Sequence, residues 1–144
     1  MKKLTYSFLL FAFITTFAIS CEEITTDLSN YDLSELDLKE VAQLIDKEVG
    51  EAKAQNISSC STIPIGVKPC GGPWGHIVFS DEESNRDTLI KLVERYNELD
   101  QIRNEESNRG STCDFATAPN LTIKDGSCYG EGRYAWNPDR FPMN

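Results

Sequence analysis

KPCGGPWGHIVFS, residues 68–80, joins a turn signal to the clearest strand signal in the chain. Its prolines, Pro69 and Pro73, and the pair Gly71 and Gly72 are typical of a tight turn, because glycine takes backbone conformations that other residues avoid. The HIVFS run at 76–80 is rich in β-branched and aromatic residues and predicts a short strand. We therefore expect a disulfide-stapled turn at Cys70 that leads directly into the sheet.

Catalytic interpretations of this stretch compete with the structural one. Its glycines precede a strand, whereas a phosphate-binding loop follows a strand and opens a helix. His76 is the only histidine, and no Gly-x-Ser-x-Gly motif supplies a nucleophile beside it. The many acidic residues lie mostly on predicted helix faces or in the N-terminal acidic stretch, not in an evident glycosidase pair. The sequence therefore predicts no enzyme, no cofactor and no metal centre.

Apolar residues at helical spacing predict two amphipathic helices around this strand. The first begins at Ser34, with Asp37 at capping-box spacing, and extends to about residue 54. The second begins near Ser84, with Asp87 at the same spacing, and ends near residue 107. The expected buried faces are Leu38, Val41, Ala42, Ile45, Val49 and Ala52 in the first helix, and Leu89, Leu92, Val93, Tyr96, Leu99 and Ile102 in the second.

The remaining segments predict loops and one hairpin. Residues 56–75 lack a helical period and are expected to form a loop with extended pieces around 63–68. NLTIKDGSCYG, residues 120–130, has an Asp-Gly turn between two β-prone runs, which is the strongest short hairpin signal. The aromatic tail is expected to be irregular or to add a short strand. The predicted fold is α+β, with two amphipathic helices packed on a small antiparallel sheet.

Four cysteines, Cys60, Cys70, Cys113 and Cys128, are expected to form two disulfides. They lack the close Cys-x-x-Cys pairs of structural zinc sites. If the second helix packs antiparallel across the strand, it returns Cys113 to Cys70 and leaves Cys60 for Cys128. The alternative pairing joins Cys60 with Cys70 and Cys113 with Cys128, and it stays open at this point.

The N-terminal segment has the pattern of an export signal. Lys2 and Lys3 precede an apolar run that is too short for a membrane-spanning helix, so residues 1–20 predict a signal peptide. It ends in AISC, residues 18–21, which resembles the lipobox of bacterial lipoproteins. The resemblance implies that Cys21 becomes the acylated first residue of the mature chain, with palmitate-type chains that hold it to the membrane. An ordinary signal peptide is the alternative.

Lipid anchoring implies a location in the bacterial cell envelope. We expect an acidic tether at residues 21–33, followed by a single small domain at 34–144. The two glutamates after Cys21 resemble a signal that sends lipoproteins to the outer face of the outer membrane in some Gram-negative lineages. A merely solvated acidic tether is the alternative.

The charge of the chain limits its partners. The formal net charge is −9, and removal of Lys2 and Lys3 with the signal peptide makes the remainder more acidic. Nucleic acid is therefore excluded as a partner, since such binding depends on Lys and Arg neutralising phosphates. Anionic lipid surfaces would also repel the chain. Membrane attachment is thus expected through the acyl chains on Cys21.

A second resemblance covers about half of the chain. Its features are Cys60, GVKPCGGP at 66–73, HIVFS, a helical ERYNEL at 94–99, and then Cys113 and Cys128. In this order they resemble a set of small exported bacterial proteins without an assigned function. The resemblance implies a common disulfide-linked fold and no particular activity.

Aromatic residues offer the candidate binding surface. Trp74, Tyr134 and Trp136 belong to the residue types that dominate interface hot spots, although they could equally complete the core of a small domain. We expect a non-catalytic binding module with a protein or glycan partner in the envelope. The alternatives are a protease-inhibitor-like module that presents the 60–70 loop, and a small carboxylate-dependent hydrolase.

Overall fold

The structure is a computed structural model that describes residues 31–140. The predicted signal peptide, the anchor at Cys21 and most of the tether lie outside the described residues. The elements, in chain order, are η2 (Leu33–Glu35), α1 (Leu38–Val49), η3 (Ile57–Ser59), β1 (Cys60–Ile65), β2 (Gly75–Ser80), α2 (Arg86–Ser107), β3 (Asn120–Lys124), β4 (Ser127–Glu131), β5 (Ala135–Trp136) and η4 (Pro138–Arg140).

The described residues form an α+β fold, which confirms the predicted fold class. A three-stranded sheet has the order β1-β2-β5, and the β3-β4 hairpin forms a separate two-stranded sheet. β1 runs antiparallel to β2, with Cys60 opposite Ser80. β5 runs parallel to β2, with His76 opposite Ala135. The three-stranded sheet is therefore mixed, where the sequence predicted an antiparallel one.

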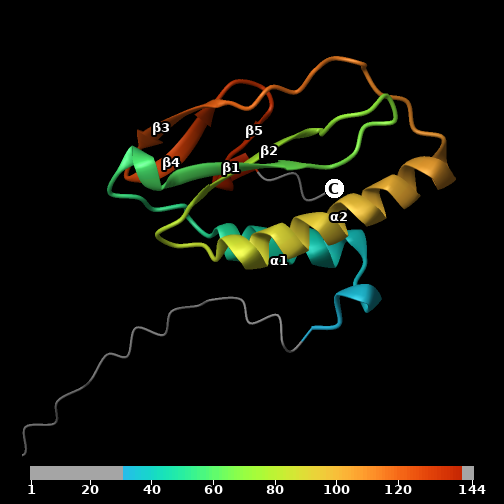
Figure 1. Ribbon diagram of the computed structural model, residues 1–144, viewed down its shortest axis with the longest axis horizontal. Helices are drawn as coiled ribbons and strands as arrows, with labels where there is room; N and C mark the ends of the chain where they lie inside the picture. The colour runs from blue at the N-terminus through green and yellow to red at the C-terminus, as the bar shows by residue number, and fades with distance from the viewer. Residues whose placement is uncertain (1–30, 141–144) are drawn as a thin grey trace, which may run out of the picture.

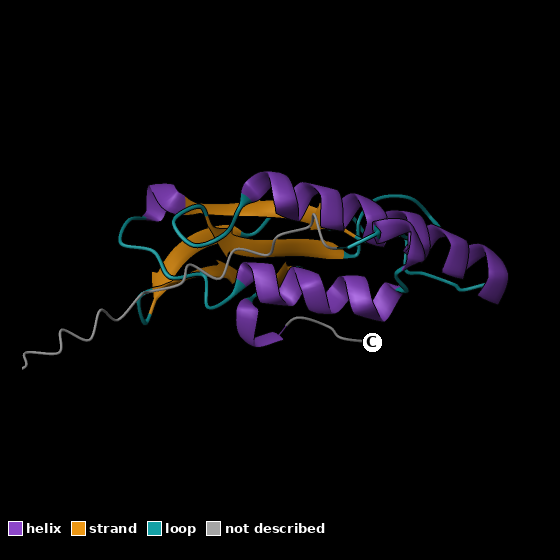
Figure 2. Cartoon of the chain, turned by 90° about the horizontal axis from the view of Figure 1, so that it is seen from below, coloured by secondary structure: helices purple, strands orange, loops and turns teal. Residues whose placement is uncertain are grey.

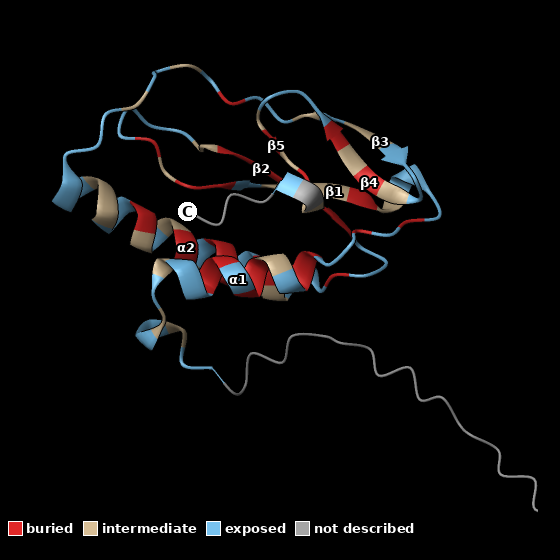
Figure 3. Cartoon of the chain, turned by 180° about the vertical axis from the view of Figure 1, so that it is seen from behind, coloured by how far each residue is buried: buried red, intermediate tan, exposed pale blue. Residues whose placement is uncertain are grey.

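β2 is the centre of the molecule and is buried along its whole length (Figure 3). Ile77 and Phe79 belong to the core shared with the two helices. Val78 belongs to a second, smaller core with Cys128 of the hairpin. Successive side chains of a strand point to opposite faces, so this one strand supplies both cores. Figure 2 shows the two helices side by side against the larger sheet.

α1 begins one turn later than predicted. Its N-cap is Asp37, whose side chain accepts a hydrogen bond from the amide of Glu40, while the Glu40 side chain accepts from the Asp37 amide. Ser34 instead lies in a short 3-10 turn capped by Asp32. The helix ends at Gly50, which has a φ of +58°. Asp37 and Glu40, which form the capping box, have the required spacing in the sequence. Ser34 and Asp37 have the same spacing, so the sequence offered two possible helix starts.

The N-cap of α2 is Asn85, not Ser84. The Asn85 side chain accepts a hydrogen bond from the amide of Thr88. Its buried face includes Leu89, Leu92, Val93 and Tyr96, as predicted. Ile102, expected to be buried, is 47% exposed, and the buried residue of the next turn is Asp100. The last turns of α2 extend past the start of α1, so they lack the apolar neighbour that the earlier turns have (Figure 1).

The prediction of a loop at residues 56–75 was wrong in part, because residues 60–65 form strand β1. The strand begins at Cys60 and contains Pro64, which argued against a strand in the sequence. β1 is an edge strand of its sheet, and proline is tolerated there because its missing N–H need not join a ladder. The predicted Asp-Gly hairpin is present, with φ values of +52° at Asp125 and +79° at Gly126.

Two disulfides join Cys60 to Cys128 and Cys70 to Cys113. This is the pairing that the antiparallel packing of the second helix favoured over the local alternative. The first bond ties β1 to β4, and the second ties the β1–β2 loop to the segment after α2. Neither helix within residues 31–140 has the combination of length and apolarity needed to cross a membrane.

Candidate functional site

The loop between β1 and β2, residues 66–74, is held against the last turns of α2 by side chains of the helix. Asn97 accepts a hydrogen bond from the amide of Gly66 at 2.7 Å. Asp100 accepts from the amide of Val67 at 2.8 Å, and Asn104 donates to the Val67 carbonyl at 2.5 Å. These three side chains replace the ladder bonds that the loop lacks, so the loop is firmly positioned without being a strand.

Asp100 is a buried charge at this end of the molecule, with 0% of its surface exposed. Besides Val67, it accepts a hydrogen bond from the Trp74 indole at 2.9 Å and from Arg103 at 2.7 Å. Arg109 lies 3.5 Å away. Burial of a carboxylate is costly unless it is paired and hydrogen-bonded, and here both conditions are met. Asp100 therefore acts as a structural clamp on the loop.

Trp74 was predicted as a candidate binding residue, and it is half-buried in the structure. The cations of Lys68 and Arg109 lie 5.8 and 5.5 Å from the centre of its ring. It also covers Gly66, where an added Cβ would lie 2.3 Å from the Trp74 ring. Gly66 has a φ of +78°, so glycine is needed there for both its conformation and its size. Trp74 mainly seals the loop against α2.

The tip of the loop carries the exposed disulfide. Gly71 and Gly72 have φ values of +93° and +81°, as the turn prediction required. The Lys68 amide donates a hydrogen bond to the Gly72 carbonyl at 2.8 Å and closes the turn. Cys70 at this tip is bonded to Cys113, which lies in the segment between α2 and β3. The disulfide thus fixes one end of that segment.

Lys68 is a second link between the loop and the segment that contains Cys113. Its side chain is 3% exposed and donates hydrogen bonds to the backbone carbonyl of Asp114 at 2.8 Å and to its carboxylate at 3.1 Å. The ammonium also lies 5.3 Å from the centre of the Tyr134 ring. A buried lysine is favourable only when its charge is compensated, and Asp114 provides that compensation.

Asp114 is the hub of this cluster. Its carboxylate accepts hydrogen bonds from the hydroxyls of Thr112 and Tyr134 and from the guanidinium of Arg133. These donors, Thr112 first, then Tyr134 and Lys68, hold the pKa of the Asp114 carboxyl well below its usual range. Asp114 therefore stays ionised across the physiological pH range, and its lone pairs are already engaged.

The structure places the three aromatic residues predicted as a binding surface in two environments. Trp74 and Tyr134 meet around Lys68, and both are half-buried. Trp136 packs against the helix-side core, and its indole nitrogen occupies the space in which a Cβ on Gly75 would lie, at 2.4 Å. These rings belong mainly to the packing of the domain.

The segment after Cys113 is held a second time at Ala116. Ala116 is 4% exposed, and its carbonyl oxygen lies 3.1 Å from the Nε2 atom of His76. A carbonyl can only accept, so Nε2 of His76 carries the proton of this hydrogen bond. The only histidine of the chain thus has a positioning role from β2, which agrees with the structural interpretation of His76.

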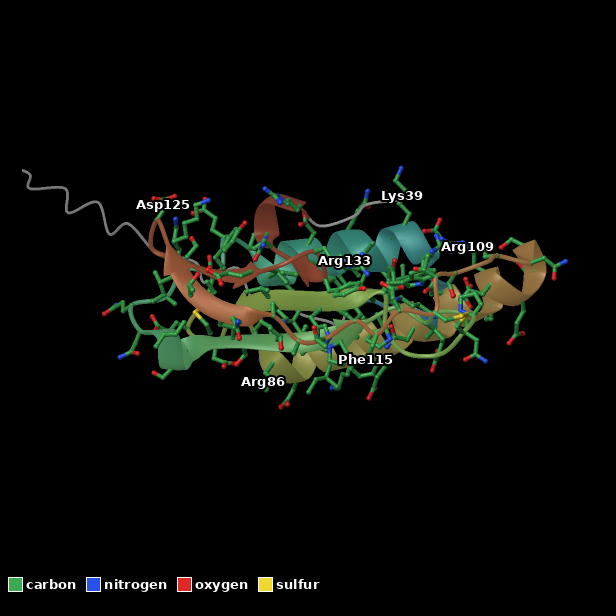
Figure 4. The ribbon with its side chains drawn as sticks, turned by 90° about the horizontal axis from the view of Figure 1, so that it is seen from above. Lys39, Arg86, Arg109, Phe115, Asp125 and Arg133 are labelled. Atoms are coloured by element: carbon green, nitrogen blue, oxygen red, sulfur yellow. A yellow bond between two sulfur atoms is a disulfide. The ribbon has the colours of Figure 1, made fainter. Side chains whose placement is uncertain are left out.

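Phe115 lies between these two points of attachment and points outward. Its side chain is 80% exposed, the highest value of any large apolar residue within residues 31–140. Within those residues, no hydrogen bond of its own N–H or C=O is found. Figure 4 looks onto the face that carries Phe115 and Arg133, with Asp125 of the hairpin turn at one end. We refer to residues 112–117 as the Phe115 segment.

The sequence did not single out Phe115. A lone aromatic residue after a cysteine is as compatible with core packing as with exposure, so no local pattern distinguishes the two. Asp100 had a detectable signal, because it continues the buried spacing of Leu92, Val93 and Tyr96 by one helical turn. Lys68 and Asp114 had none, since their pairing joins segments far apart in the chain.

Residues 60–70, which the sequence proposed as a protease-binding loop, are only partly a loop in the structure. Residues 60–65 form β1, and the amides of Gly66 and Val67 donate hydrogen bonds to side chains of α2. The Phe115 segment lies on the other side of the Cys70–Cys113 bond.

A hollow of about 410 Å³ lies at the opposite end of the domain, between the hairpin turn and the end of α1. Lys53, Lys124 and Tyr129 are among its lining residues. Lys53 pairs with Glu51 at 3.0 Å, and Lys124 lies 4.8 Å from the Tyr129 ring centre. Within the described part of the chain, no three His, Cys, Asp or Glu side chains are grouped as metal ligands would be.

Comparisons with protein-family models, with curated proteins and with solved structures find no match for this chain.

Proposed function

We propose that this protein is a lipid-anchored, non-catalytic binding module of the bacterial cell envelope. Acyl chains on Cys21 would hold it to the outer membrane, with the domain exposed at the cell surface. The Phe115 segment would make the central contact with a protein partner. The two disulfides support an exported location, because such bonds persist mainly in oxidising compartments.

The observation that carries this proposal is the combination of exposure and restraint at Phe115. The side chain is 80% exposed, although its neighbours Asp114 and Ala116 are both held by the interior. A large apolar side chain that is ordered and exposed can bury its area against a partner at little cost in conformational entropy. Aromatic anchors of this kind provide much of the binding energy at interfaces.

The polar cluster supports a binding role over a catalytic one. Asp114 accepts hydrogen bonds from the side chains of four residues: Thr112, Tyr134, Lys68 and Arg133. A general base or nucleophile needs a lone pair directed at a substrate, and here those of Asp114 serve to position the Phe115 segment. A carboxylate-dependent hydrolase stays the alternative, and single Asp and Glu substitutions that abolish a hydrolytic activity would favour it.

The binding role is tested by photo-crosslinking in intact cells. A benzophenone-bearing phenylalanine analogue replaces Phe115, and in a control strain it replaces Ile57, which is also exposed and lies on η3 at the opposite end of β1. We expect a discrete adduct from position 115 and none from position 57. Equal adduct patterns at both positions, or none at position 115, would contradict the proposal.

The anchor is tested separately by labelling cells with radioactive palmitate. The wild-type protein should incorporate label, and the Cys21→Ser variant should lose both the label and its association with the membrane fraction. Label that persists in Cys21→Ser would show that the acyl chains are attached elsewhere.

A further inference from the structure

We propose that the Phe115 segment is an inhibitory loop, which inserts Phe115 into the primary specificity pocket of a protease that cleaves after aromatic residues. This inference rests on the proposed binding function and names the class of its partner. It replaces the 60–70 loop as the protease-binding element. Its basis is the alternating exposure of residues 114–117, the attachment of the segment on both sides of Phe115 and the way the domain would survive cleavage.

The first argument is the alternating exposure of residues 114–117. Asp114 is half-buried and Ala116 is buried, whereas Phe115 and Thr117 are exposed. A peptide segment that binds along the edge strand of a protein places alternate side chains in pockets, and Phe115 would be the side chain that enters the pocket. The N–H and C=O of Phe115, which have no partner within residues 31–140, are available for that pairing.

The second argument is pre-organisation. The Cys70–Cys113 bond fixes the segment two residues before Phe115, and Lys68 holds the Asp114 carbonyl at 2.8 Å. His76 holds the carbonyl of Ala116 at 3.1 Å on the other side. Restraining a loop in its bound conformation reduces the entropy lost on binding, which separates a tight inhibitor from an ordinary substrate of the same sequence.

The third argument concerns cleavage of the bond between Phe115 and Ala116. Hydrolysis would add one water molecule, leaving a carboxylate on Phe115 and an amine on Ala116. The fragment that begins at Ala116 would stay attached through the Cys60–Cys128 bond. Cys113 and the Ala116 carbonyl would also stay held, so the two new ends would remain close together. Such proximity corresponds to a high effective concentration and favours re-formation of the peptide bond over release.

The experiment uses the protein purified from cells that express the full chain, with bovine chymotrypsin as the probe and trypsin as the comparison. We expect tight inhibition of chymotrypsin and no inhibition of trypsin. Phe115→Arg should weaken chymotrypsin inhibition by at least about thirtyfold and create inhibition of trypsin, because the exposed side chain alone would select the pocket. Ile57→Arg is the matched control and should behave as wild type.

Several outcomes would overturn the inference. One is rapid, complete cleavage after Phe115 without inhibition, which would make the segment a substrate. Another is no inhibition of chymotrypsin by wild type together with no inhibition of trypsin by Phe115→Arg. Chymotrypsin inhibition that survives Phe115→Arg would place the inhibitory contact elsewhere. A crosslink at position 115 with a partner that is not a protease would retain the proposed binding function and refute the protease as partner.

Discussion

The two disulfides lie in contrasting environments. Cys60 and Cys128 are 8% and 1% exposed and form part of the smaller core, whereas Cys70 and Cys113 are exposed at the end of the molecule where α2 ends. One bond joins two strands, and the other joins two loops. The buried bond thus belongs to the scaffold, and the exposed bond belongs to the segment that the scaffold positions. The Cys60–Cys128 bond therefore mainly stabilises the fold, and the Cys70–Cys113 bond mainly positions the Phe115 segment.

The lengths of the loops that the two disulfides close cannot account for a large difference in the stability that they confer. The bonds close loops of 68 and 43 residues. In the chain-entropy account these lengths differ by only about 0.4 kcal/mol in the stability they confer. Any larger difference must come from the native state, where the exposed loops can gain freedom when released and the buried strands cannot.

The largest expected effect is the loss of the buried bond. Cys60→Ala combined with Cys128→Ala should lower the free energy of unfolding by about 4 kcal/mol or more, because packing in the smaller core is lost with the cross-link. Urea unfolding followed by circular dichroism measures this loss. A decrease no larger than that of the exposed pair would contradict the assignment of scaffold and presented segment.

The second effect concerns Asp100, which holds the loop between β1 and β2 against α2. Asp100→Ala should lower the free energy of unfolding by about 2–3 kcal/mol, since it leaves the Val67 amide, the Trp74 indole and Arg103 without their shared acceptor. Glu94→Gln, an exposed change on the same helix, should have almost no effect. Equal stability of the Asp100 and Glu94 variants would refute the clamp.

The third effect is the loss of the exposed bond. Cys70→Ala combined with Cys113→Ala should cost only about 2 kcal/mol, because the released loops regain conformational freedom in the native state. Binding through Phe115 should nevertheless fall strongly, since the segment loses its restraint. Unfolding and photo-crosslinking measured on the same variant separate the two quantities. Retained crosslinking would indicate that Asp114 and Ala116 are sufficient restraints.

The smallest effect is a pH dependence. The pKa of Asp114 is lowered in the folded protein, so its contribution to stability is complete above the unfolded value of about 4 and is lost as pH falls through the lower, folded value. The stability advantage of wild type over Asp114→Asn should therefore shrink on acidification below about pH 4. Urea unfolding at a series of pH values measures it. A constant difference between the two proteins would contradict the assignment.

The scaffold side of this comparison was largely predictable from the sequence, for local reasons. β2 was visible in HIVFS, the hairpin in its Asp-Gly turn, and most of both helix faces in the spacing of apolar residues. The errors were also local. Pro64 argued against a strand where β1 lies. Ser34 and Ser84 were predicted as N-caps, but the N-caps are Asp37 and Asn85. Neighbouring cap residues compete closely, and tertiary packing decides between them.

The presented side was mostly not predictable. Lys68, Asp100 and Asp114 come from three separate segments, and their pairing depends on how α2 packs against the sheet. Trp74 and Tyr134 were recognised as notable, but the sequence could not tell that Lys68 would draw both toward the interior. The exposure of Phe115 follows from the inward attachment of its two neighbours, which is a property of the folded domain.

The central claim is that Phe115 is presented to a partner and does not stabilise the fold, and the unfolding of Phe115→Ala tests it most directly. Phe79→Ala provides the comparison, because Phe79 is 0% exposed and should cost about 3–5 kcal/mol on truncation. We predict that Phe115→Ala changes the free energy of unfolding by less than about 0.5 kcal/mol. A loss that approaches the Phe79 value would show that Phe115 packs within the protein and would contradict the claim.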